Sequence, residues 1–230
     1  MTRLLTILLV ICLIIPAATG FAQASNARSN ASLQKLQIRV DELYERGEFE
    51  RAFLIYRDEL ASIGDKYAQY MVGYMVLTGQ GVRQDPIQAS AWYRLAAERG
   101  TAEFEQVRDE LLDDFDAAEM QRSHSAYRTL CREYCDVVLL LDVIRENLHE
   151  LSSVTGSRVS STGRPLTIID RRTNRLMTGD EYYGRIRQQL ETRLGMIAKL
   201  TGATDLSTNP DDVNIDEIEK IVEDYLREQP

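Results

Sequence analysis

Apolar residues recur at helical spacing along most of the chain, in segments separated by glycine-containing turns. In the first segment they lie three and four positions apart, which places them on one face of a helix. They are Leu33, Leu36, Val40 and Leu43. After the turn Arg46-Gly47-Glu48, a second apolar stripe runs to Ile63-Gly64-Asp65. The pattern therefore predicts a pair of helices over residues 33–65.

A second pair of helices has clearer ends. We expect helices over residues 66–77 and 86–99, joined by the glycine-containing loop 78–84. Asp85 suits the N-cap of the second helix, and Gly100 suits its C-terminal end. These end signals predict a compact helix-turn-helix unit.

The two helix pairs share a repeat. Ala52 and Tyr56 recur as Ala89 and Tyr93, 37 residues later. Repeats of this length, each made of two helices, indicate a solenoid in which every unit buries its apolar face against the next. The predicted fold class is therefore mainly all-α: an α-helical solenoid of helix-turn-helix repeats.

Within the second pair, small, aromatic and glycine positions form a signature. It consists of Ala68-Gln69-Tyr70-Met71-Val72-Gly73-Tyr74-Met75, then Gly79-x-Gly81-Val82-x-x-Asp85, then Ala89-x-x-Trp92-Tyr93-x-x-Ala96-Ala97-x-x-Gly100. This signature resembles the Sel-1-like repeat, a relative of the tetratricopeptide repeat, although Val76, Arg83 and Pro86 depart from the usual residues. The resemblance extends over about residues 33–134, with a degenerate first unit and a closing helix pair after Gly100.

The resemblance implies a protein-binding role. Exported Sel-1-like proteins are similar in role to adaptors in envelope regulation, exopolysaccharide assembly and motility. The first helix of each unit lines the concave face of a solenoid. On that face Tyr67 and Tyr74 are the candidate partner-binding residues, because tyrosine is a frequent interface anchor. Tyr70 lies on the same stripe and is expected to pack inward, and Gly73 is expected to let neighbouring helices approach closely.

Residues 136–230 match no family that we recognise and are expected to form an α-rich extension of the solenoid, which spans residues 33–135. The pattern predicts helices over residues 137–151, 179–200 and 215–227, a linker or loop over 152–163, and a short β-hairpin with strands at 166–169 and 176–177. Thr178 with Glu181 and Asn214 with Glu217 have the spacing of capping boxes at the starts of the last two helices.

The first 24 residues are predicted to be a cleaved signal peptide. Arg3 is followed by an apolar run over residues 4–15, and Ala22-Gln23-Ala24 has the small-x-small pattern of a cleavage site. The run is about a dozen residues, shorter than the roughly 20 that a spanning helix needs; an uncleaved anchor is the alternative. Residues 25–32 are small and polar and predict a flexible leader. We therefore expect a periplasmic protein without stable membrane insertion.

Charge narrows the choice of partners. The net charge is −9, which argues against nucleic acid as a partner, because its binding needs a basic surface. Residues 158–199 nevertheless carry nine basic and four acidic residues, whereas residues 205–230 carry nine acidic and two basic ones. Two readings remain open: the last helix folds back on the basic segment, or the Arg-rich segment 158–193 binds an anionic ligand that the tail masks.

Few residues suit catalysis or cofactor binding. The chain has two histidines, His124 and His149, and no Gly-x-Ser-x-Gly motif. Glu146 and His149 have the spacing of a di-iron helix pair, but such sites need a second pair and further carboxylates. We therefore predict no catalytic residue, no metal site and no cofactor.

Cys131 and Cys135 are the two cysteines that remain after the signal peptide. In an oxidising compartment such a pair is usually a disulfide. Because residues i and i+4 of a regular helix lie about 5–6 Å apart at Cβ, a bridge requires the helix to end near Tyr134. Free thiols and links to another chain are the alternatives.

Taken together, these patterns predict a periplasmic protein–protein interaction module that acts as an adaptor or regulator on another envelope protein. A structural subunit of an envelope assembly is one alternative. A cell-wall hydrolase with its site within residues 137–230 is the other.

Overall fold

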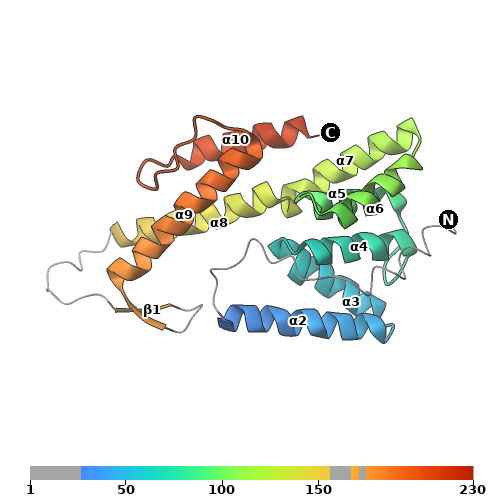
Figure 1. Cartoon of the computed structure of the whole chain (residues 1–230), viewed down its shortest axis with the longest axis horizontal. Helices are drawn as coiled ribbons and strands as arrows, with labels where there is room; N and C mark the ends of the chain where they lie inside the picture. The colour runs from blue at the N-terminus through green and yellow to red at the C-terminus, as the bar shows by residue number, and fades with distance from the viewer. Residues whose placement is uncertain (1–26, 156–166, 171–174, 230) are drawn as a thin grey trace.

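The computed structural model describes residues 27–155, 167–170 and 175–229, and these residues are mostly helical (Figure 1). The predicted mainly all-α fold class is confirmed. The predicted signal peptide lies outside the described residues, as do residues 156–163 of the predicted linker and the first four arginines of the Arg-rich segment. Within the described ranges, no helix combines the length and the apolar character that crossing a bilayer requires.

The first helix pair is α2 (Ala27–Glu45) and α3 (Phe49–Ile55). α2 already begins at Ala27, so the part of the predicted flexible leader that is described is helical. The helix after the turn is less regular than its apolar stripe predicts. It continues from α3 as a π-helical turn, Tyr56–Leu60, and a 3₁₀ turn, Ala61–Ile63.

The second pair is α4 (Lys66–Thr78) and α5 (Pro86–Ala97), close to the predicted bounds. Both helices begin at an aspartate whose carboxylate accepts a backbone N–H: Asp65 from Ala68 and Asp85 from Gln88. These caps satisfy backbone donors that have no partner within the helix.

The third pair closes the solenoid. It consists of α6 (Ala102–Asp113) and α7 (Ala117–Tyr134). A reciprocal capping box between Asp116 and Glu119 starts α7. Cys135 then takes an extended conformation, and α8 (Asp136–Thr155) begins directly after it.

The extension contains α8, a hairpin and two further helices. Strands β1 (Thr167–Asp170) and β2 (Arg175–Thr178) pair antiparallel, with Ile168 opposite Met177. α9 (Gly179–Thr201) starts at the predicted Thr178–Glu181 capping box and packs against α8 and the hairpin. α10 (Ile215–Glu228) lies against α7, α8 and α9 (Figure 1).

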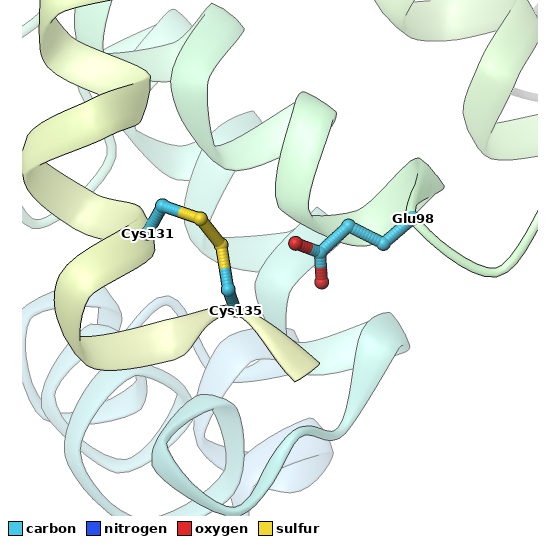
Figure 2. Close-up of side chains that lie close together, drawn as sticks. All are labelled: Glu98, Cys131 and Cys135. Carbon is cyan, nitrogen blue, oxygen red and sulfur yellow. A yellow bond between two sulfur atoms is a disulfide. The ribbon is translucent and has the colours of Figure 1, made fainter. Parts of the chain in front are cut away.

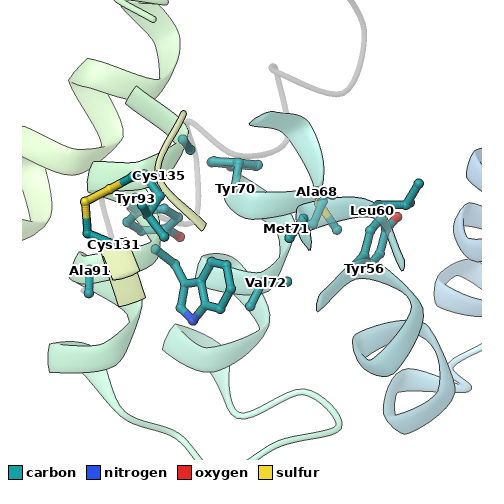
Figure 3. Close-up of a cluster of buried hydrophobic side chains, with 14 of the residues drawn as sticks. Tyr56, Leu60, Ala68, Tyr70, Met71, Val72, Ala91, Tyr93, Cys131 and Cys135 are labelled. Atoms are coloured by element: carbon teal, nitrogen blue, oxygen red, sulfur yellow. A yellow bond between two sulfur atoms is a disulfide. The ribbon is translucent and has the colours of Figure 1, made fainter. Parts of the chain in front are cut away.

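A continuous hydrophobic core runs through both parts. In the solenoid it includes Tyr56, Tyr70 and Tyr93, which lie between neighbouring helix pairs (Figure 3). The same cluster continues into the extension through buried residues of α8, α9 and α10. These include Ile144, Leu190, Leu194, Ile218 and Val222. The extension is therefore packed onto the repeats rather than tethered to them.

Candidate functional site

The two predicted partner-binding tyrosines lie on α4, two helical turns apart. Tyr67 is 40% exposed, whereas Tyr74 is half-buried and packs against the core. Tyr70 lies between them and is buried, as expected from the sequence. Of the predicted pair, Tyr67 therefore offers the larger accessible surface to a partner.

Tyr67 is supported by other aromatic rings. Its ring centroid lies 6.4 Å from that of Tyr70, in a stacked arrangement, and 6.5 Å from that of Tyr56. Tyr70 in turn stacks on Tyr93 at 5.6 Å and on Phe104 of α6 at 5.3 Å. This series of rings joins all three helix pairs. It holds the exposed ring of Tyr67 in place, so that little side-chain entropy is lost when a partner binds.

A second feature is a groove of about 480 Å³ on the side of α3, α5 and α7, the second helix of each pair. The sequence did not predict it. Its lining includes Phe53 of α3, Trp92 of α5 and Tyr134 of α7. Trp92 and Tyr134 make an edge-to-face contact with centroids 4.7 Å apart. Phe53 and Trp92 are both buried, so this groove exposes little of their aromatic surface.

A partly buried cluster of charges joins the solenoid to the extension. The ammonium of Lys66, at the start of α4, lies 2.6 Å from Glu98 Oε2 and 3.1 Å from Asp136 Oδ1. Arg99 donates two hydrogen bonds of 2.8 Å to the Asp136 carboxylate. We call Lys66, Glu98, Arg99 and Asp136 the ion-pair cluster. No local pattern in the sequence predicts it, because its members come from α4, the end of α5 and the start of α8.

The pKa values of the two carboxyl groups in the ion-pair cluster are shifted in opposite directions. For Asp136, burial favours the neutral form, but hydrogen bonds from Arg99 and the charges of Lys66 and Arg99 outweigh it and lower the pKa. For Glu98, burial is the largest influence and raises the pKa, although the ammonium of Lys66 opposes it. The charged form of Glu98 is therefore favoured mainly by Lys66, and that of Asp136 by Arg99 and Lys66 together.

The cysteine pair lies beside this cluster. Cys131 and Cys135 are buried, and their Cα atoms are 4.5 Å apart, a separation that suits a disulfide (Figure 2). α7 ends at Tyr134, as a bridge requires, and the pairing itself remains a prediction. Glu98 lies close enough to both sulfurs for the three to be considered as metal ligands. Because Lys66 already neutralises Glu98, we propose no metal there.

The residues considered for catalysis lie in structural positions. Ser123 is buried and shares a hydrogen bond of 2.7 Å with Ser90. His124 is half-buried on α7, where burial and the charges of Arg94 and Arg128 lower its pKa. His149 lies exposed on α8. These positions place no base beside a nucleophile of the described chain.

The described arginines of the Arg-rich segment include two that pair within the protein. Arg185 donates a hydrogen bond of 2.5 Å to the buried carboxylate of Asp170. Arg187 lies 3.6 Å from Asp211, in the loop before α10. The second contact agrees with a C-terminal segment that folds back on basic residues, whereas the first joins α9 to the hairpin. Anion binding by the segment 158–193 remains a prediction.

Comparison with known families agrees with this geometry. The chain is a helical-repeat protein, and the family model of the Sel1 repeat matches residues 66–101, which are α4, the glycine-containing loop and α5. The resemblance found in the sequence is confirmed for this unit. Sel1 repeats generally mediate protein–protein interaction and are typically non-enzymatic. Searches of curated proteins and of solved structures gave no significant match.

Proposed function

We propose that the protein is a periplasmic interaction module that binds another envelope protein through the face of α4. The observation that carries this proposal is the exposed ring of Tyr67, backed by the rings of Tyr56 and Tyr70. Rigid aromatic anchors of this kind contribute strongly to interfaces. The predicted signal peptide supports the periplasmic location, and the Sel1 repeat supports protein binding over catalysis.

The experiment is site-specific photo-crosslinking in intact cells. A photoreactive phenylalanine analogue is placed at position 67, and in a matched protein at position 54. Leu54 is 49% exposed on α3, so both sites are accessible but belong to different helices. We expect a discrete crosslinked product from position 67 and a much weaker one from position 54. Mass spectrometry of the product then identifies the partner.

A substitution separates binding from folding. Tyr67→Ala should lower capture of the crosslinked partner by about tenfold or more, as loss of an interface anchor does. Because the ring is exposed, the melting temperature should change little. The proposal is rejected if position 67 gives no product, or if Tyr67→Ala captures the partner as well as the unaltered protein.

A further inference from the structure

A groove lined by four arginines lies between α7, α8 and α10. Its volume is about 840 Å³, within the range of sites that enclose ligands. The arginines are Arg128, Arg132, Arg145 and Arg227. We call this feature the arginine groove. Its lining contains two acidic residues, Glu219 and Glu223, so it is locally basic in a chain of net charge −9.

The four arginines fall into two groups. Arg145 bonds to Glu219 and Asp142 at 2.8 Å, and Arg227 pairs with acidic residues of its own helix. Arg128 and Arg132 are both exposed, and neither makes a hydrogen bond or an ion pair with another residue of the described chain. Two free guanidinium groups, four residues apart on α7, therefore point to a ligand that carries negative charge.

The rest of the lining indicates what else the ligand contains. Leu141 and Val222 line the groove but are buried. Its accessible aliphatic surface comes from Val138 of α8 and Leu226 of α10, which are half-buried. No aromatic side chain of the described residues lines the groove, so it offers no platform on which a sugar ring or a base could stack. Aliphatic surface beside basic groups fits a segment with apolar residues on one side and acidic residues on the other.

The protein already contains one example of this type of contact. α10 is an acidic amphipathic helix that buries Ile218 and Val222 and bonds to Arg145 through Glu219. Arg128 and Arg132 line the same groove and, unlike Arg145, make no hydrogen bond or ion pair with acidic residues of α10. The complementary surface for a further acidic helix is therefore present beside α10.

We infer that the arginine groove binds an acidic amphipathic segment of a partner protein, with its carboxylates on Arg128 and Arg132 and its apolar side chains on the aliphatic surface. Carboxylates one helical turn apart on the partner match the spacing of the two arginines. Bidentate pairing makes arginine well suited to carboxylates. This site is separate from Tyr67, and the inference does not depend on the proposed function of α4.

The test measures fluorescence anisotropy with the full mature protein. The probe is a labelled 18-residue peptide with leucine on one helical face and glutamate on the other. A peptide of the same composition in scrambled order is the reference. We expect the amphipathic peptide to bind more tightly, and its affinity to fall as salt rises, because ionic strength screens exposed charges over about 8–10 Å.

Two double variants locate the site. Arg128→Glu with Arg132→Glu should weaken binding by about thirtyfold or more, because repulsion replaces two charge-assisted pairs. Arg39→Glu with Arg122→Glu makes the same change of net charge at exposed positions outside the groove, and should change affinity less than about threefold. Since Arg128 and Arg132 make no hydrogen bond or ion pair with the described residues, the melting temperature of the groove variant should fall by only about 3 °C or less, from reversing the charge of Arg132 in the last turn of α7.

Three results overturn the inference. One is equal weakening in both double variants, which indicates a general effect of net charge. Another is equal binding of the amphipathic and scrambled peptides. The third is binding to vesicles of anionic phospholipid, lost in the groove variant, when neither peptide binds; the groove is then a lipid-binding surface.

Discussion

Gly81 lies where the loop between α4 and α5 touches the first helix pair. Its φ is +69°, a left-handed conformation that glycine adopts easily. A Cβ at this position would also lie 2.5 Å from the backbone nitrogen of Glu50 and closer still to the carbonyl carbon of Phe49. The glycine is thus needed both for the turn and for the contact between repeats.

A matched pair of substitutions separates these two effects. Gly47 has a φ of +76°, and a Cβ added there would meet no atom within 4 Å, so Gly47→Ala carries only the conformational cost. We expect that variant to lose about 1 kcal/mol. Gly81→Ala should lose about 1–3 kcal/mol more, because backbone atoms have to shift. Urea unfolding of both variants measures the difference, and equal losses would contradict the contact.

Lys66 is the residue on which the ion-pair cluster depends. Lys66→Ala leaves Glu98 and Asp136 without their shared ammonium group. Removing one partner of a buried pair is strongly destabilising, and we expect a loss of about 3 kcal/mol at pH 7. The measurement is the free energy of unfolding of both proteins in urea.

The pH dependence of this loss has a defined sign. In the unaltered protein the pKa of Asp136 is lowered, so its contribution to stability is present above the pKa of the unfolded chain and is lost as pH falls through the folded value. In Lys66→Ala both carboxyl groups protonate more readily. The difference in unfolding free energy between the two proteins should therefore begin to shrink above the ordinary pKa of a glutamate, because the pKa of Glu98 is raised, and should shrink further as Asp136 protonates at lower pH. If the difference stays constant down to acid pH, the ion-pair cluster is excluded as the cause of the lost stability.

Residues of the repeat signature could be assigned from sequence because their roles follow from size and local backbone. Gly73 is an example: a Cβ there would lie 2.7 Å from the ring of Tyr93. Lys66, Glu98 and Asp136 could not be assigned, because they lie far apart in the chain and meet only in the folded protein. Tyr67 was predicted from helical spacing, but its neighbour Tyr70 also stacks on Phe104, a contact that depends on the third helix pair.

At the scale of elements, helix ends were the most predictable feature. Asp85 and Thr178 cap helices where the sequence places them, and the hairpin forms with strands shifted or lengthened by about one residue. Asn214 caps α10 too, but it accepts from the N–H of Asp216 instead of forming the predicted box with Glu217. These signals are local, so they can be read without tertiary context. The π-helical turn at residues 56–60 was missed, because an apolar stripe of helical spacing does not distinguish it from a regular helix.

The junction of α7 and α8 depends on Cys131 and Cys135. Both side chains are buried, so free thiols would resist alkylation in the native state as well as a disulfide does. Protein isolated from the cell fraction in which it is found should therefore be unfolded in denaturant without reductant before alkylation. We expect no label under these conditions and two labels after reduction, by intact mass. Labelling of both cysteines without reductant would exclude the disulfide.

The predicted disulfide between Cys131 and Cys135 should also stabilise the folded protein. A crosslink that closes so short a loop is expected to add about 2 kcal/mol through the entropy of the unfolded chain. Reduction should lower the melting temperature by about 5 °C or more. Cys131→Ser with Cys135→Ser should lower it similarly, and reductant should then have no further effect on that variant. A melting temperature that does not respond to reductant in the unaltered protein would contradict this expectation.

At the scale of the whole molecule, the extension completes the solenoid. Asp136 belongs to α8 but bonds to Lys66 and Arg99 of the second helix pair. Val137 and Leu141 of α8 belong to the same core as the repeats. The boundary at residue 135 between repeats and extension follows the family pattern in the sequence. The packing of side chains, however, continues across that boundary.

Two fragments that start at Ser25 test this dependence. A fragment ending at Cys135 keeps the cysteine pair but loses Asp136 and all of α8, whereas a fragment ending at Gly202 loses only α10 and the loop before it. Amide hydrogen exchange of α4 and α5 reports the stability of the Sel1 repeat itself. We expect protection of these helices to drop about a hundredfold or more in the shorter fragment, because it loses roughly 3 kcal/mol from the broken ion-pair cluster. In the longer fragment the cluster is intact, and protection of α4 and α5 should stay close to that of the whole protein. Equal protection in both fragments would mean that the repeats are stable without α8, and that the ion-pair cluster only attaches the extension to them.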